Sequence, residues 1–323
     1  MASRTNLVSP FLRRGLDARG MMVGMMICLT LNAAHFALRY DPGFALRYLL
    51  CLALGGALDL AYSLLKDGRP AFPRASTFVT AALLVLSVPA RMPGWQVGAG
   101  LLVAVWFGKR MVDSRALRLN PMLLGRLFMM IVFADSIQAW LPPGTQIDAL
   151  SSATPLGLFA AERVAYSPLQ LLLGHIGGDW EGLYALLPGS PGEVLPLLSL
   201  ACGAALVLGG IADWRPGVFY LLGFALMVFL LDMPLAFHLA AGSTAFTAVY
   251  IVSDPRSMPG SKFGRMAAGL LAGAGNAALR KQGFFPEGVV LAVLAVNLLS
   301  PTLDRLAFAA RGLALRRAAR RPK

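Results

Sequence analysis

The sequence predicts an all-α polytopic membrane protein with about ten transmembrane helices, and three observations support this class. Of the 323 residues, 57% are hydrophobic and only 14% are charged, whereas a soluble domain carries roughly a quarter charged residues. The apolar residues come in blocks of about twenty, the length that a helix needs to cross the hydrocarbon core. The basic residues gather between alternate blocks, as the positive-inside rule requires. A transmembrane barrel would instead show short segments of alternating polarity.

Ten apolar blocks account for the predicted helices. The first, from Gly20 to about Phe36, follows four arginines as a signal peptide would, but it is long and lacks an obvious small-residue cleavage site. It is therefore predicted to remain as the first transmembrane helix. The seventh block is short, which allows a broken or tilted helix there. The blocks cover residues 20–38, 45–65, 74–89, 95–112, 121–140, 193–212, 217–231, 235–252, 265–280 and 285–303.

The distribution of Lys and Arg predicts the orientation. If the N-terminus is cytoplasmic, 22 of the 29 basic residues lie on the cytoplasmic side and six on the external side, with Arg126 inside a span. This asymmetry predicts that both termini are cytoplasmic. The net charge of +13 then reflects membrane topology, so no nucleic-acid partner is expected. The basic end RRAARRPK, from Arg316 to Lys323, is expected to contact the lipid bilayer.

One connection is far longer than the others and divides the chain into two halves. It covers residues 141–192, is net acidic and is predicted to be an external, periplasmic loop. Long loops in compact proteins are usually functional or disordered. Its apolar piece, PLQLLLGHIGG from Pro168 to Gly178, is expected to pack back onto the membrane domain. The predicted organisation is a cytoplasmic N-terminus (1–19), a first five-helix repeat (20–140), this loop (141–192), a second five-helix repeat (193–304) and a basic tail (305–323).

The two halves resemble each other in sequence. The third block begins ASTFVTA, from Ala75 to Ala81, and the eighth contains GSTAFTA, from Gly242 to Ala248, with its Ser-Thr pair 167 residues later. Because each half has five spans, the second copy would run in the opposite direction through the membrane. The sequence therefore predicts an inverted repeat, an arrangement in which polar sites lie where the two repeats meet.

Several polar residues fall within the apolar blocks or at their ends. Ionisable groups at membrane depth often mark ion pathways or cofactor sites. Asp59 lies deepest and is a candidate for an ion path, whereas Asp135 and Asp232 are expected at the membrane interface. No His, Cys or Glu cluster has metal-ligand spacing, and the three cysteines lie far apart in apolar blocks, so neither a metal site nor a disulfide framework is predicted. The other polar residues of this kind are His35, His238, Asn276 and Asn297.

The stretch DALSSATP, from Asp148 to Pro155, stands out within the external loop. Taken alone, Thr154 followed by Pro155 is typical of a helix N-cap with proline at the first helical position. That interpretation assigns the hydroxyl of Thr154 to the backbone. Any chemical role for the hydroxyl requires that it be free.

Longer motifs give the chain a family resemblance. The strongest stretch runs from Ser253-Asp254-Pro255 through RKQGFFPEGVVLAVLAVNLLSPTLD, which ends at Asp304. Upstream, Val79-Thr80, Leu119-Asn120-Pro121 and LGHIGG from Leu173 to Gly178 follow in the matching order. From about residue 8 to 306, the chain resembles the family of the D subunit of Rnf electron-transport complexes and the B subunit of sodium-translocating NADH:quinone reductase.

The resemblance implies a covalent flavin. In that family, an external motif close to D-x-x-S/T-G-A-T-P carries FMN on its threonine through a phosphoester bond, which a flavin transferase installs. The corresponding residue here is Thr154, and Asp148, Ser151, Ser152 and Ala153 form the surrounding motif. Ser152 replaces the family glycine, a departure that bears on transferase recognition. By the same resemblance, the GHIGG stretch with His175 is expected near the flavin, and Asp254, Arg280 and Glu287 are expected to be structural or flavin-adjacent.

The resemblance also implies a function and a fold. The expected protein is a non-autonomous subunit of an ion-translocating (Na⁺ or H⁺) oxidoreductase of the bacterial inner membrane, with other complex subunits as partners and a urea-transporter-like membrane domain. The family's reductase B subunit carries a long N-terminal extension that is not seen here, which favours the Rnf D type. Some members also hold a non-covalent riboflavin, for which Arg74 and Ala75 depart from the family pattern. The alternative is a small-solute transporter or channel without flavin. Catalytic residues are not identified.

Overall fold

The computed structural model describes residues 18–111, 118–137, 155–156, 167–176, 185–186, 189–283 and 288–319. It is helical almost throughout, which confirms the predicted class. Within the described residues, strand pairing is limited to β1 (His175–Ile176) and β2 (Ala185–Leu186), which are antiparallel. Each of the ten predicted apolar blocks contains a helix.

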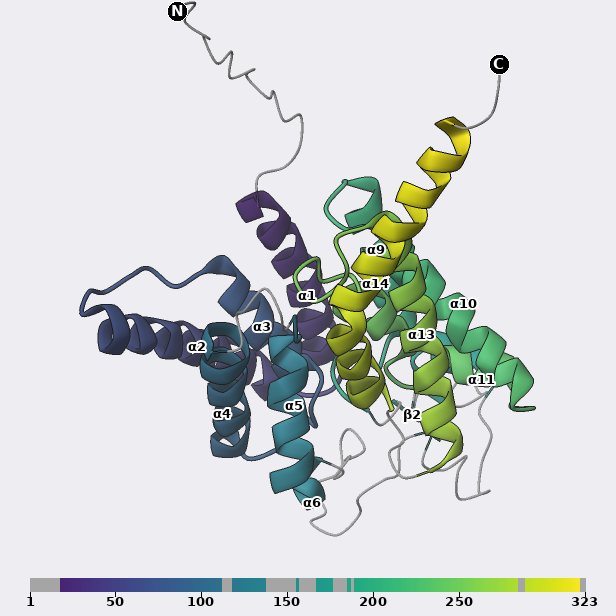
Figure 1. Cartoon of the computed structure of the whole chain (residues 1–323). Helices are drawn as coiled ribbons and strands as arrows, with labels where there is room; N and C mark the ends of the chain where they lie inside the picture. The colour runs from purple at the N-terminus through teal and green to yellow at the C-terminus, as the bar shows by residue number, and fades with distance from the viewer. Residues whose placement is uncertain are drawn as a thin grey trace, which may run out of the picture.

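The helices form two groups in chain order. The first comprises α1 (Ala18–Arg39), α2 (Gly43–Asp67), α3 (Ala75–Leu86), α4 (Gly94–Leu102) with the π-helix η1 (Val103–Met111), α5 (Pro121–Val132) and α6 (Ala134–Ile137). After the short α8 (Pro168–Leu173), the second comprises α9 (Pro196–Leu208), α10 (Trp214–Leu230), α11 (Leu235–Ala240), α12 (Thr244–Phe246) with the π-helix η2 (Thr247–Ile251), α13 (Lys262–Lys281) and α14 (Val289–Ala319). Figure 1 shows α2 to α6 on one side and α10, α11, α13 and α14 on the other, and the start of α1 and the end of α14 both lie toward the top of the view.

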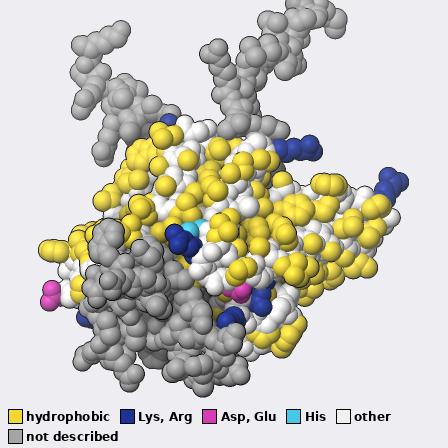
Figure 2. All heavy atoms as spheres, turned by 180° about the vertical axis from the view of Figure 1, so that it is seen from behind, with side chains coloured by type: hydrophobic (Ala, Val, Ile, Leu, Met, Phe, Trp, Pro, Cys, Tyr) yellow, Lys and Arg dark blue, Asp and Glu magenta, His cyan; other side chains and the backbone are white. Residues whose placement is uncertain are grey.

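Three of these helices are long and apolar enough to cross a membrane. They contain Arg19–Arg39, Gly43–Lys66 and Val289–Ala310, and shorter apolar helices accompany them. Large apolar side chains are exposed on the outer faces, with Leu38 at 84%, Leu208 at 88% and Phe229 at 73% of full exposure. Figure 2 shows apolar side chains over most of one face, with few charged groups among them. Such a continuous apolar surface fits a bilayer rather than water, and the chain is a membrane protein.

The broken helix lies in the eighth block and not in the seventh. The seventh forms the unbroken α10, in which Pro216 sits in the first turn, where proline costs no intrahelical hydrogen bond. The eighth is interrupted between α11 and α12, where Gly242 adopts φ +65°, a left-handed conformation that favours glycine. Of the two possibilities named for the short seventh block, a broken or a tilted helix, the structure therefore excludes the break.

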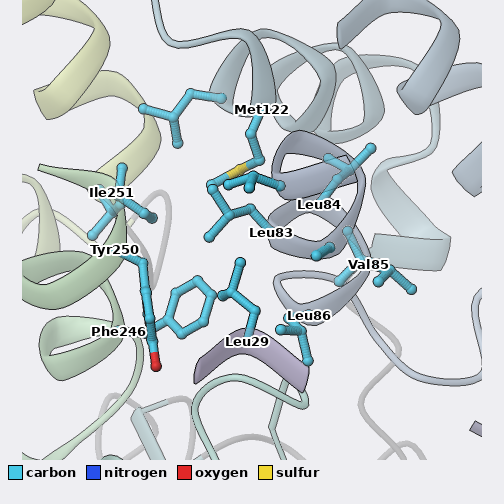
Figure 3. Close-up of a cluster of buried hydrophobic side chains, with 14 of the residues drawn as sticks. Leu29, Leu83, Leu84, Val85, Leu86, Met122, Phe246, Tyr250 and Ile251 are labelled. Carbon is cyan, nitrogen blue, oxygen red and sulfur yellow. The ribbon is translucent and has the colours of Figure 1, made fainter. Parts of the chain in front are cut away.

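The core lies where the two groups of helices meet. Figure 3 shows Leu83 of α3 facing Phe246, Tyr250 and Ile251 of the second group, with Leu29 and Met122 between the two groups and Leu84 and Val85 on the far side of α3. Polar groups buried in this core form hydrogen bonds: the Asn32 amide donates to Tyr250 Oη at 2.9 Å, and the Ser199 hydroxyl donates to Asn32 Oδ1 at 3.1 Å. The core therefore contains the two helices that carry the repeated Ser-Thr sequence, α3 and α12–η2.

Candidate functional site

The break between α11 and α12 leaves polar backbone groups inside an apolar helix bundle. A broken helix exposes backbone carbonyls and amides that require other partners, and a bilayer offers no water to satisfy them. Here the carbonyls belong to His238 and Ala241, at the end of α11. They accept hydrogen bonds from the last turn of α13, through a single side chain.

That side chain is Arg280. Its Nη1 donates to the carbonyls of His238 at 3.1 Å and Ala241 at 3.3 Å, and its Nη2 donates to Thr244 Oγ1 at 2.9 Å. The guanidinium also lies 4.9 Å from the centre of the Phe224 ring, a cation–π arrangement. Arg280 is 8% exposed. A cation at the carbonyl end of a helix is favourable, so Arg280 stabilises the break.

The charge of Arg280 is not directly paired among the described residues. No described carboxylate lies within ion-pair distance of it, and its Nε has no hydrogen-bond partner there. Glu193, which is 9% exposed, interacts electrostatically with both Arg280 and Arg126. Arg126 of α5 is 3% exposed, so two buried guanidiniums share this carboxylate. Uncompensated buried charge is costly, and the surroundings of Arg280 therefore favour a further anion.

The long connection between the two groups of helices reaches this region through Leu156. A Cβ built on Gly242 would lie 2.6 Å from Leu156 Cδ1 and 3.3 Å from Arg280 Nη2, so both side chains converge on this glycine. Leu156 is 7% exposed and packs in a small apolar cluster with Leu171, Phe237, Ala240 and Ala241. The described part of DALSSATP and the residue after it therefore lie beside the helix break.

Helix α8 packs back onto the membrane domain, as predicted for the loop's apolar piece. It starts with a capping box between Ser167 and Gln170 and ends at Gly174, which has φ +72°. A Cβ on Gly174 would meet the Val194 carbonyl oxygen at 2.5 Å, so glycine permits the close approach to the start of α9. Helix α8 also contacts α11. This packing therefore holds α8 against the start of α9 and against α11, the helix that ends at the break.

The predicted flavin residues fall mainly outside the described residues. This applies to Asp148, Ser151, Ser152, Ala153, Thr154 and Glu287. Pro155 and Leu156 are helical and buried, and covalent geometry keeps the Cα of Thr154 within about 8 Å of that of Leu156. The backbone of His175 pairs with Leu186 in the β1–β2 ladder, and its side chain is not among those described.

The other polar residues singled out in the sequence lie elsewhere. Asp59 is 1% exposed, and its carboxylate accepts the Arg74 backbone N–H at 2.9 Å, which places it at the start of α3 and away from Arg280. Asp135 and Asp232 are exposed, as expected of residues at an interface. His238 is buried. Asn276 donates to Tyr220 Oη at 2.7 Å, a helix-to-helix contact.

Two buried ionisable residues were missed or misjudged from sequence. Lys109, near the end of the fourth block, was not singled out; it lies within η1 and is 1% exposed, with Nζ 3.4 Å from Thr80 Oγ1. Glu193 is the first residue of the sixth block, and its burial was not predicted. A charge that falls inside an apolar block, or at its edge, is the signal that could have identified both.

The fold and the site together define a class: a membrane protein in which a broken helix and buried charges form a polar site between two groups of helices. The chain belongs to the NQR2, RnfD, RnfE family, whose family model matches residues 5–311. This confirms the resemblance found in the sequence motifs.

Three relatives illustrate the similarity, and each is named as the B subunit of a Na(+)-translocating NADH-quinone reductase. The protein from Chromohalobacter salexigens is 32% identical over 275 residues, covering 80% of this chain and 63% of that protein. The Azotobacter vinelandii protein is 32% identical, and that of Pseudomonas aeruginosa PAO1 is 30% identical, each over 294 residues, with 86% of this chain and 68% of the relative covered. The chain thus spans about two thirds of the length of these relatives.

Proposed function

We propose that the chain is a membrane subunit of an ion-translocating oxidoreductase complex of Rnf type, inactive alone, that carries FMN covalently on Thr154 and transfers electrons coupled to Na⁺ or H⁺ movement. The observation that carries the proposal is the docking of Leu156, two residues after Thr154, beside the buried Arg280. The family membership supports the reaction class. The partners would be other subunits of the complex and a flavin transferase.

The residues of the site fit a phosphoryl-linked flavin. FMN would supply the redox chemistry, and the chain would supply an anchor, a counter-charge and an enclosure. Thr154 offers the hydroxyl, and the small neighbours Ser151, Ser152 and Ala153, with Asp148, would leave it accessible to a transferase. Arg280 offers a buried guanidinium with an unpartnered Nε, which suits a phosphate oxygen. His175 follows Gly174 on the loop that packs against the same site.

We also propose the ten-span, inverted-repeat architecture, similar to urea-transporter-like folds, with the five-part division given above and both termini in the cytoplasm of a bacterial inner membrane. The helix packing supports it. Helix α1 contacts its counterpart α9, and α5 contacts its counterpart α14. In each half a buried cation reaches the Ser-Thr helix: Lys109 at Thr80, and Arg280 at Thr244.

Asp59 remains the candidate for the ion path. Its burial at 1% exposure supports the proposal, whereas its hydrogen bond to the start of α3 also gives it a structural role. Asp59→Asn keeps the acceptor oxygen and removes the charge. We expect coupled ion transport by the assembled complex to fall at least about tenfold, as for loss of a charged group on a membrane pathway, while the protein remains folded. Unchanged transport would exclude Asp59 from the path.

The second candidate is a small-solute transporter or channel without flavin, favoured by the broken helix at the interface of the two groups. The two candidates differ in one chemical property, the covalent cofactor. A non-covalent riboflavin in the membrane domain is compatible with the first and not with the second.

Thr154→Ala is the decisive substitution. The protein is produced with the flavin transferase, denatured, separated by electrophoresis and examined for flavin fluorescence. We expect a fluorescent band from the unsubstituted chain and none from Thr154→Ala, because a phosphoester needs the hydroxyl. Ser152→Gly is the matched control, since it removes a neighbouring hydroxyl, restores the glycine of the family motif and should keep the band. A dark band from the unsubstituted chain favours the transporter, and fluorescence in Thr154→Ala refutes the anchor.

A further inference from the structure

We propose that Arg280 binds the phosphodiester that joins the flavin to Thr154, and so fixes the docked position of the flavin at the external end of α13. Arg280 is in this sense a positioning residue that takes no part in forming the bond. The inference rests on the proposed function. It assigns to a residue that stabilises the helix break a second task, as the counter-charge of the cofactor.

The geometry brings the anchor segment to the guanidinium. Both approach Gly242: a Cβ on this glycine would lie 2.6 Å from Leu156 Cδ1 and 3.3 Å from Arg280 Nη2. Thr154 is two residues from Leu156, so its Cα lies within about 8 Å of the Leu156 Cα. An arginine side chain and a phosphoryl threonine can meet across that distance.

The hydrogen bonds of Arg280 leave donors available. A guanidinium has five N–H donors. Two from Nη1 and one from Nη2 are used by the carbonyls of His238 and Ala241 and by Thr244 Oγ1. The donor on Nε and one donor on Nη2 remain, and Nε is buried without a partner among the described residues. Two such donors are suited to the oxygens of a phosphoryl group.

The charge balance around Arg280 favours one further anion. Glu193 is the described carboxylate that acts on Arg280, and it does so without an ion-pair contact while also acting on Arg126. Among the described residues, Arg280 is therefore compensated by a carboxylate only from a distance. A phosphodiester carries one negative charge at neutral pH, and its binding would compensate Arg280 in a place where excess charge is costly.

The first experiment measures docking separately from attachment. Arg280→Gln and the matched Lys281→Gln, which removes an exposed charge at the next position, are produced with the transferase. Both should give the fluorescent band after denaturation. In the folded protein, Arg280→Gln should lower the ratio of docked to undocked flavin by about tenfold or more, as expected for truncating one partner of a buried charge pair. The shift appears as lower fluorescence anisotropy and stronger quenching by iodide.

Lys281→Gln should match the unsubstituted chain in both readings. Arg280→Lys, which retains the charge without the planar donors, should lie between the two. Unchanged anisotropy and quenching in a flavin-loaded Arg280→Gln protein would overturn the inference and leave the Thr154 anchor intact.

A second experiment removes the covalent bond. It keeps the inference testable if Arg280→Gln fails to load flavin or to fold. Free FMN and free riboflavin, which differ only by the phosphate, are each added to the Thr154→Ala protein. FMN should raise the melting temperature of the detergent-solubilised Thr154→Ala protein more than riboflavin does. The double variant Thr154→Ala with Arg280→Lys should retain part of that difference. The double variant Thr154→Ala with Arg280→Gln should lose it. Equal shifts by the two ligands in Thr154→Ala would overturn the inference. Failure of the anchor itself shows separately, as fluorescence that persists in denatured Thr154→Ala.

Discussion

Gly273→Leu is expected to abolish the packing of α13 against α10 and with it most of the folded protein. Gly269 and Gly273 are four residues apart on α13, and α10 crosses directly over them. A Cβ at Gly273 would overlap the carbonyl oxygen of Tyr220, and one at Gly269 would overlap that of Pro216. Small residues at this spacing let membrane helices approach backbone to backbone. Because the obstacle is backbone and not a side chain, it cannot rotate away.

The expected cost of Gly273→Leu is about 4 kcal/mol or more, beyond the usual range for overpacking a core. It is measured as the yield and melting temperature of monodisperse protein in detergent. Gly275→Ala is the matched control, since a Cβ there would lie 3.4 Å from Ala292 Cβ, an ordinary contact. If the Gly273→Leu protein had the same melting temperature as the unsubstituted chain, α10 and α13 would not approach as closely as described.

The sequence predicted the helices well because length and apolarity are local properties. Every predicted block contains a helix, although α14 continues to Ala319, well beyond the tenth block. The position of the break was not predictable in this way, because the seventh block, which is the short one, forms the unbroken helix α10. Gly242 of the eighth block takes up the left-handed conformation, and one glycine among 34 carries no signal that says which of them will do so.

The site was predictable only in part. Motif similarity singled out Thr154, and Arg280 was expected to be structural or flavin-adjacent, but its partners could not be predicted. They lie 36 to 42 residues earlier in the chain, at Thr244, Ala241 and His238. That contact depends on how α11, α12 and α13 pack in three dimensions. Lys109 stands near the end of the fourth block, and its burial depends on the packing of η1 against α2, α3 and α5, which the sequence does not show.

Asp304→Ala is expected to be nearly as damaging as the glycine substitution, at the opposite end of α13. Asp304 of α14 accepts the backbone N–H groups of Gly260 and Ser261, each at 2.9 Å, and the Arg118 guanidinium at 3.0 Å. It therefore ties the loop before α13, the segment before α5 and α14 together. Asp304 is 8% exposed, whereas both hydrogen bonds to the loop are only partly buried, so water would replace the carboxylate only in part.

The expected loss for Asp304→Ala is about 3 kcal/mol, since hydrogen bonds to a buried charge are individually worth more than neutral ones and leave unsatisfied donors when removed. Asp304→Asn separates the contributions, because it keeps one acceptor oxygen for Gly260 or Ser261 and loses the charge that holds Arg118. It should fall between the alanine variant and the unsubstituted chain in melting temperature. Asp41→Ala is the control, since Asp41 accepts only the exposed Gly43 N–H at 2.9 Å and should cost less than about 1 kcal/mol. Equal melting temperatures for Asp304→Ala and Asp41→Ala would mean that the three segments are held together by apolar packing and not through this carboxylate.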